Sequence, residues 1–435
     1  MYDSMKAYIY YKTSIKRFDK TRLSLIKLAW VILFFGSLNL SQRTADDILD
    51  KAITPEVFHR MLSITIVTVI LFILLLMQCP NNFLKGIIPS ALLLFSLWRI
   101  LSTFWSSNPL WTFYRSMEYL VTICLLIITI RSMKNLTHLS KWSNTVWIWV
   151  GLLVLSVYVG AIINPAEALK PFPGAVLPYA LNGVFPRIHN TAFAEYGGII
   201  ALVGLSRIFD NKKNRIVSLL IFIGGLVTIV LAQGRAAIIG LLVGISIILF
   251  FHRKIALLWS LVIVLLTLSL FWPSIFEILG IYYFRGQTYD QFLSLSTRLD
   301  WWLKVLDQLI APRLIEGYGA FAGGRILAPI LLGAVNTRIT LDNAWLEILL
   351  DTGVVGMILF SIPVIYAYYI LLTKAIKGPI RQRYLAIEVL AILTTLLIRS
   401  FFVSTITLQL AFPLFVCLGT AELLGKYYYK KAVGS

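Results

Sequence analysis

The chain has 435 residues, of which 59% are hydrophobic and only 14% are charged, and its mean hydropathy is +0.83. Soluble domains carry about 25% charged residues and are about half apolar, so the composition excludes an ordinary soluble protein. The formal charge of +19 does not indicate a nucleic-acid-binding protein, because the basic residues are dispersed between apolar segments rather than clustered.

Apolar runs of about 18 residues, the length needed to cross roughly 30 Å of hydrocarbon, recur along the whole sequence. They predict an all-α, polytopic membrane protein with about 12 transmembrane helices. We expect the first span to be retained, because a basic tail of about 22 residues precedes it and no small-residue cleavage site follows. The predicted spans are 24–41, 61–78, 87–104, 117–131, 145–163, 191–207, 216–233, 236–251, 255–272, 354–373, 384–401 and 406–425.

The connections between the predicted spans alternate between two faces of different charge. With the N-terminus in the cytoplasm, nearly every cytoplasmic connection is basic, as in "KRFDKTR", "RIFDNKKNR" and "KAIKGPIRQR". Cytoplasmic loops are enriched in Lys and Arg, so the alternation predicts an even number of spans with both termini inside.

One long segment, 273–353, is predicted on the outward face between the ninth and tenth spans. Its stretches "IFEILGIYYF" and "RLDWWLKVLDQLI" are typical of short amphipathic helices that lie at a membrane interface. Loops of this length are usually functional or disordered, and the Trp, Tyr and Leu content argues against disorder. We therefore divide the chain into a bundle over 1–272, this loop over 273–353, and a second bundle over 354–435.

Arginines stand on the outward face, although positive charge is normally kept off the translocated side. A guanidinium binds phosphate through two parallel hydrogen bonds, which lysine cannot do. Arg235 in the tight turn "QGRAA", Arg298 in "STRLDWW" and Arg187 in "FPRIHN" therefore predict a site for a membrane-borne anion such as a lipid-linked pyrophosphate. Between 273 and 341 the basic residues are Arg285, Arg298, Lys304, Arg313, Arg325 and Arg338.

Each of these arginines also has a purely structural interpretation. Arg235 could extend to the membrane interface or pair with Glu195, although a charge near membrane depth marks a functional site by default. Arg298 could form a local ion pair with Asp300 or Asp307. The other outward basic groups have solvated, interfacial or packing roles as their alternatives: Arg187, His189, Arg313, Arg325 and Arg338.

Three acids precede the tenth predicted span in "DNAWLEILLDTGVVG". Asp342 is a candidate general base, with Glu347 in reserve, because a carboxylate can take the proton of an attacking hydroxyl. Alternatively, Asp342 caps the following helix. Glu347 and Asp351 share a helix face and could pair with loop arginines, while Gly353 and Gly356 suit a bend or close helix packing.

Four stretches, in order, resemble the superfamily of bacterial O-antigen ligases and O-antigen polymerases: "STFWSSNPLWTFYRS", "QGRAAIIGLLVG", "LSTRLDWWLKVLDQLIAPRLIEGYGAF" and "DNAWLEILLDTGVVGMILF". The resemblance runs from end to end and implies about twelve spans, cytoplasmic termini and one large periplasmic loop. It places Arg235 and Arg298 at the positions of the family's two essential arginines, which contact undecaprenyl pyrophosphate. Arg187 lies at the position of a third periplasmic arginine of the family. The ligases carry histidine before the asparagine at the start of span 10, where this chain has Asp342.

The resemblance implies an inverting, metal-independent glycosyltransferase without a cofactor, acting at the periplasmic face of the bacterial inner membrane. Asp342 in place of histidine favours an O-antigen or exopolysaccharide polymerase, with a ligase that uses lipid A core as the alternative. The expected catalytic residues are Asp342, Arg298 and Arg235, with Arg187, Arg235 and Arg298 on the pyrophosphate and Glu347, Arg338 and His189 as secondary candidates. The expected partners are an undecaprenyl-pyrophosphate-linked oligo- or polysaccharide, an acceptor glycan or lipid A core, the lipid bilayer and a chain-length regulator, with no nucleic acid.

Two other functions are weaker interpretations. A metal-dependent lipid-sugar glycosyltransferase would use Asp46, Asp47 and Asp50 of "TADDILD", although solvated loop acids explain that run more simply. A polysaccharide or lipid transporter or flippase would also suit twelve spans. Transporters usually show internal repeats and charges near the membrane midplane, whereas this sequence has no evident repeat and gathers its charge at one face.

Overall fold

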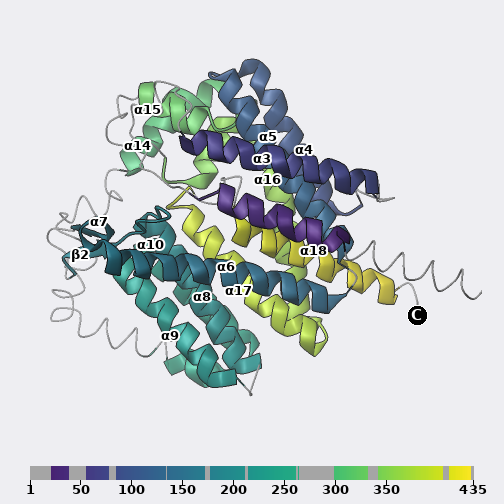
Figure 1. The fold of residues 1–435 in the computed structure, drawn as a ribbon, viewed down its shortest axis with the longest axis vertical. Coiled ribbons are helices and arrows are strands. Elements are labelled where there is room, and N and C mark those ends of the chain that lie inside the picture. Colours follow the sequence, from purple (N-terminus) through teal and green to yellow (C-terminus); the bar gives the residue numbers. More distant parts are fainter. Residues whose placement is uncertain are drawn as a thin grey trace, which may run out of the picture.

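The computed structural model describes residues 21–38, 55–77, 85–133, 135–171, 177–210, 214–260, 263, 298–331, 341–404 and 411–432. This part of the chain is almost entirely helical (Figure 1). Seven of its helices are long and apolar enough to cross a membrane, which agrees with an all-α polytopic membrane protein. The total of about 12 spans stays a prediction.

A helix lies at every predicted span except 255–272, most of which lies outside the described residues, as does "IFEILGIYYF". Residues 21–36 form the first described helix. The long helices that follow are α3 (Pro55–Met77), α4 (Ile87–Leu101), α5 (Pro109–Ser132), α6 (Leu136–Ile163), α8 (Asn190–Asp210), α9 (Arg215–Ala232), α10 (Arg235–Phe251), α16 (Ala344–Lys377), α17 (Ile380–Ser400) and α18 (Phe412–Ala432).

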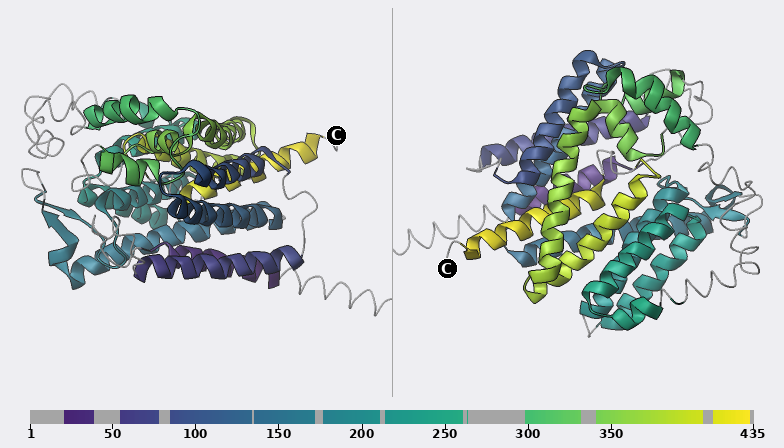
Figure 2. Two further views of the ribbon diagram at one scale, coloured as in Figure 1. Left: turned by 90° about the horizontal axis from the view of Figure 1, so that it is seen from above. Right: turned by 180° about the vertical axis from the view of Figure 1, so that it is seen from behind.

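Short elements connect these helices at one end of the bundle. They are the single-turn helix α7 (Pro165–Ala168), the antiparallel strands β1 (Leu169–Pro171) and β2 (Tyr179–Leu181), and the helices α14 (Arg298–Val305) and α15 (Ala328–Leu331). Figures 1 and 2 show α7, the strands and α14 at the end opposite the C-terminal end of α18. The segments that we predict to face outward therefore lie together.

The interior of the bundle is built around α5 and α17, and apolar side chains face outward elsewhere. Leu125 and Leu126 of α5 and Ile392 of α17 have no exposed surface. On the periphery, α3 exposes apolar side chains such as Phe72 (62%) and Leu76 (72%). Exposed apolar faces of this kind suit lipid, because lipid tails are as apolar as the side chains.

The helix α16 is broken at Gly353, where φ is 66° and ψ is −172°. The helix begins at Ala344, ahead of the predicted span at 354, and its first turns therefore lie within the segment that we assigned to the loop. The predicted bend at Gly353 is confirmed. Such a break leaves backbone groups without their usual partners four residues along the helix.

These backbone groups are satisfied from outside the helix. Partners come from the loop segment 314–319 and from the end of α4. The hydrogen bonds run from Tyr318 N to Leu350 O (2.9 Å), from Gly319 N to Asp351 O (2.9 Å), from Trp98 Nε1 to Thr352 O (2.8 Å) and from Val354 N to Leu314 O (2.8 Å). The break thus fastens the outward loop to the bundle, as buried backbone groups require partners.

Replacement of Gly353 by alanine is expected to destabilise the protein by at least about 2 kcal/mol, because only glycine adopts this backbone conformation without strain. The added Cβ would also overlap the backbone of Ile315. The measurement is thermal unfolding of the purified protein in detergent micelles. Gly224→Ala in α9 is the control: no atom lies within 4 Å of its Cβ, so its stability should stay equal or rise. Equal stability of the two variants would show that the break is not required.

Candidate functional site

Arg298 and Asp342 lie side by side at the end of the bundle that we predict to face outward. Nη2 of Arg298, the first residue of α14, lies 3.0 Å from Oδ2 of Asp342, and the two side chains are 28% and 33% exposed. Nη1 of Arg298 donates to the carbonyl oxygen of Phe402, just past α17, at 3.2 Å. Arg298 therefore pairs with Asp342 rather than with Asp300 or Asp307, so the local alternative is wrong.

Packing of α14 fixes this pair. Trp301 and Val305 of α14 are buried against the start of α16. Nε1 of Trp302 donates to the carbonyl oxygen of Leu341 at 2.7 Å, which anchors the residue immediately before Asp342. The short helix α14 thus positions the Arg298 cation, and the residues before α16 position the Asp342 anion opposite it.

Asp342 does not cap α16, so that alternative is also wrong. The cap is Asn343, whose Oδ1 accepts hydrogen bonds from the backbone of Trp345 (3.0 Å) and Leu346 (3.1 Å). Asp342 itself has a φ of 51°, a left-handed conformation that Asp and Asn tolerate better than most residues. The cap is therefore one residue later than expected, and the Asp342 carboxylate faces Arg298 instead.

The other two acids of this stretch have structural partners. Glu347 is buried, lies 3.6 Å from Nη2 of Arg325 and accepts from the Leu341 backbone at 3.3 Å, which confirms pairing with a loop arginine. Asp351 instead accepts backbone hydrogen bonds from Phe321 and Gly324, both at 2.8 Å. These two carboxylates hold the loop segment 321–325 against α16.

A buried ion pair that the sequence did not suggest lies beneath the site. Arg399, at the end of α17, pairs with Glu195 of α8 and donates to the Thr191 carbonyl oxygen. Both charged side chains are almost completely buried. Glu195 therefore pairs with Arg399, and the alternative pairing of Glu195 with Arg235 stays a prediction. The available signals were an acid within a predicted span and an arginine in the outward connection "RSFFVST".

The loop before α8 brings His189 close to the same charges. His189 Nδ1 lies 3.0 Å from Thr191 Oγ1. Desolvation, helped by Lys170 and Arg399, lowers the pKa of His189 below its ordinary value, and the nearby Asp342 opposes this shift. The imidazole is therefore mostly neutral at neutral pH and adds no positive charge.

Arg187 and Arg235 flank this loop. Arg187 pairs with Glu167 of α7 rather than only extending to the interface. Arg235 begins α10 after the two-residue turn at Gln233 and Gly234, as "QGRAA" predicted. Gly234 packs against Ala194 of α8, so Arg235 lies beside the first turns of α8. A helix N-terminus also favours an anion there.

The side chain of Gln233 holds this turn in place. The residue is fully buried and has a φ of 54°. Its Nε2 donates to the carbonyl oxygens of Leu177 and Tyr179, both at 2.9 Å. The turn that carries Arg235 is thereby fastened to the loop that carries Arg187 and His189.

The remaining predicted residues lie elsewhere. Arg313 is exposed, donates to the Trp105 carbonyl oxygen at 3.2 Å and stacks over Tyr318, which agrees with an interfacial role. Arg338 lies outside the described residues, as do the three acids of "TADDILD". Among the described residues, no group of three or more His, Cys, Asp or Glu side chains could hold a metal ion.

Loss of the buried acid should be far more damaging than loss of an exposed one. Glu195→Gln removes the carboxylate partner of the buried Arg399 guanidinium, and we expect a loss of about 3 kcal/mol. Glu167→Gln removes the partly exposed partner of Arg187 and should cost less than about 1 kcal/mol. Thermal unfolding of both variants in the same detergent tests this, and equal shifts would contradict a dependence of Arg399 on Glu195.

Comparison with known proteins bears on the region that contains most of these residues. Residues 218–361 match the family described as O-antigen ligase, and this range includes Arg235, Arg298 and Asp342. No curated protein matches the chain. Over this domain, which is about a third of the chain, the protein is similar to the O-antigen ligase family.

Proposed function

We propose that this membrane enzyme is a metal-independent, inverting glycosyltransferase that polymerises undecaprenyl-pyrophosphate-linked glycans at the periplasmic face of the inner membrane. The observation that carries the proposal is the 3.0 Å pair of Arg298 and Asp342 within the region that matches the O-antigen ligase family. A guanidinium and a carboxylate side by side are the two groups that this transfer needs. One receives the leaving anion, and the other receives a proton.

Arginines supply the positive charge for the leaving group. As the bond between the anomeric carbon and the pyrophosphate oxygen breaks, negative charge grows on the pyrophosphate, and preorganised cationic donors stabilise it. Arg298 and Arg235 fill this role, with Arg235 assisted by the N-terminus of α10. Arg187 binds at the edge of the same anion, where its present partner is Glu167.

Asp342 acts as the general base. The acceptor hydroxyl oxygen attacks the anomeric carbon from the face opposite the pyrophosphate, and its proton passes to the Asp342 carboxylate. In the free enzyme this carboxylate is held by Arg298. The incoming pyrophosphate competes for the same guanidinium, so donor binding releases Asp342 toward the acceptor.

Asp342 favours polymerase over ligase, because it occupies the position at which the ligases are expected to carry histidine. A ligase that transfers glycan to lipid A core remains the alternative, since the same arginines would serve it. Transport ranks lower, because the match to the O-antigen ligase family favours an enzyme. A chain-length regulator stays a predicted partner.

Deletion of the gene, followed by complementation, distinguishes these functions. We expect the deletion strain to carry single repeat units on its surface glycan, since polymerisation alone is lost. Arg298→Ala and Asp342→Asn should fail to restore long chains, because one loses the anion partner and the other loses the base. The glycan is read on a silver-stained gel, with membrane levels of each variant measured in parallel.

Arg313→Ala is the matched control, because Arg313 is an exposed loop arginine away from the Arg298–Asp342 pair, and it should restore long chains. Bare core with long glycan on the lipid carrier would instead identify a ligase. An unchanged glycan profile after deletion would rule out both roles in that polysaccharide.

A conservative change tests how Arg298 binds the anion. Arg298→Lys keeps the charge but loses the planar pair of donors that binds phosphate oxygens and contacts Phe402. We expect the transfer rate to fall by about tenfold or more, since each 1.4 kcal/mol of lost stabilisation is a factor of ten. The measurement is chain elongation by reconstituted protein with a synthetic lipid-linked repeat unit. A lysine variant as active as wild type would show that only the charge matters.

A further inference from the structure

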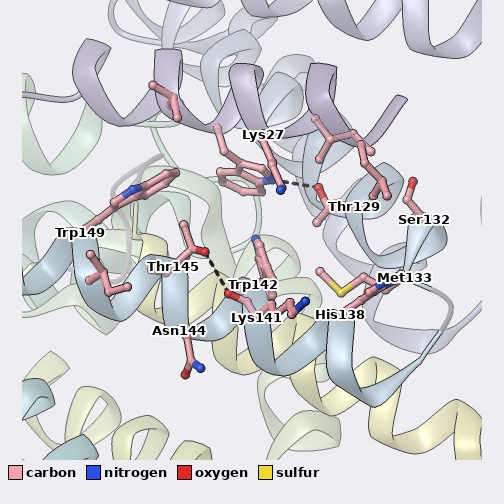
Figure 3. A pocket seen from close by; sticks show the side chains of 16 residues that line it. Lys27, Thr129, Ser132, Met133, His138, Lys141, Trp142, Asn144, Thr145 and Trp149 are labelled. Atoms are coloured by element: carbon pink, nitrogen blue, oxygen red, sulfur yellow. Dashed lines mark hydrogen bonds between the residues drawn. The ribbon is translucent and has the colours of Figure 1, made fainter. Parts of the chain in front are cut away.

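A cavity lies at the opposite end of the bundle from the candidate site. Its volume is about 660 Å³, and it is enclosed by the helix at 21–36, the last turns of α5 and the first turns of α6 (Figure 3). Most of its lining is apolar, and three tryptophans contribute to it: Trp30, Trp142 and Trp149. A cavity with aromatic walls at the end of membrane-spanning helices suits a molecule with a long apolar body.

Three basic side chains line the same cavity. Lys27 extends from one wall, and Lys141 and His138 extend from the other (Figure 3). No acidic residue lines the cavity. Within the described part of the chain, neither lysine ammonium has an ion pair, and the buried Nδ1 of His138 has no hydrogen-bond partner. The chemistry of the opening therefore fits an anion.

The position of the cavity indicates where such a ligand comes from. The start of the helix at 21–36, the end of α5 and the start of α6 are the helix ends that the charge alternation assigns to the cytoplasm. Tryptophan is enriched at the level of the lipid headgroups. Anionic lipids at the cytoplasmic surface attract lysine and arginine side chains that lie nearby.

We propose that this cavity binds one anionic phospholipid of the cytoplasmic leaflet. Its phosphate lies between Lys27 and Lys141, and His138 contributes a hydrogen bond through the nitrogen that lacks a partner. One acyl chain lies along the tryptophans. A zwitterionic lipid carries no net negative charge for the two ammonium groups, and a free phosphate has no apolar part to fill the cavity. The site is independent of the proposed transferase function.

Photochemical labelling in vesicles tests the proposal. The full-length protein is reconstituted in phosphatidylcholine that contains a small fraction of phosphatidylglycerol with a photoreactive acyl chain. We expect the label on peptides that contain residues 23–31 and 142–149. Unlabelled phosphatidylglycerol should compete, and additional phosphatidylcholine should not. Labelling spread evenly over the lipid-facing helices, or equal competition by both lipids, would overturn the proposal.

Paired lysine variants make the test specific. Lys27→Gln with Lys141→Gln should lower labelling of these peptides by about thirtyfold, because each of the two basic residues near the surface contributes about 1 kcal/mol to the attraction of anionic lipid. The control is Lys254→Gln with Lys377→Gln, which removes two exposed lysines that do not line the cavity. Labelling should be retained in the control. Equal labelling of the two double variants would show that the cavity does not select an anionic lipid.

Discussion

The break in α16 is the constraint on which the arrangement of the predicted outward face depends. At Gly353 the helix gives up its own hydrogen bonds, and a chain at this depth must satisfy them from elsewhere in the protein. The loop segment 314–319 supplies most of them, with Trp98 of α4 supplying another. The loop is therefore held by backbone hydrogen bonds, which depend little on side-chain identity. The loop arginines acquire fixed positions as a result.

The attachment of this loop to α16 in turn fixes the positions of the charged residues. The buried cluster of Trp301, Val305 and Leu350 packs α14 against the first turns of α16, and Trp302 secures Leu341. Asn343 then starts the helix, which leaves Asp342 ahead of it and facing Arg298. Beneath them, Arg399 and Glu195 join α17 to α8. The charged end of the bundle is thus tied together by helices from both halves of the chain.

The sequence predicted the helices well, because runs of apolar residues are a strong signal for membrane spans. The sequence also indicated the turn at "QGRAA" and the break at Gly353 correctly, because tight backbone geometry requires particular residues, such as glycine, at the position itself. The partner of a charged side chain in the folded protein, in contrast, is not indicated by the residues next to it in the sequence. Arg298 has nearer acids in Asp300 and Asp307, yet packing directs it to Asp342. Adjacent Asp and Asn are both good helix caps, so only the register of the folded helix decides that Asn343 takes that role.

The pairing of Arg298 with Asp342 also bears on the order in which substrates bind. Under the proposed mechanism, the free enzyme keeps its base engaged by a cation, so a sugar hydroxyl or a water molecule that arrives first meets a carboxylate that is already occupied. Only the lipid-linked donor brings the anion that can displace it. The enzyme then follows a compulsory-order kinetic scheme, donor before acceptor.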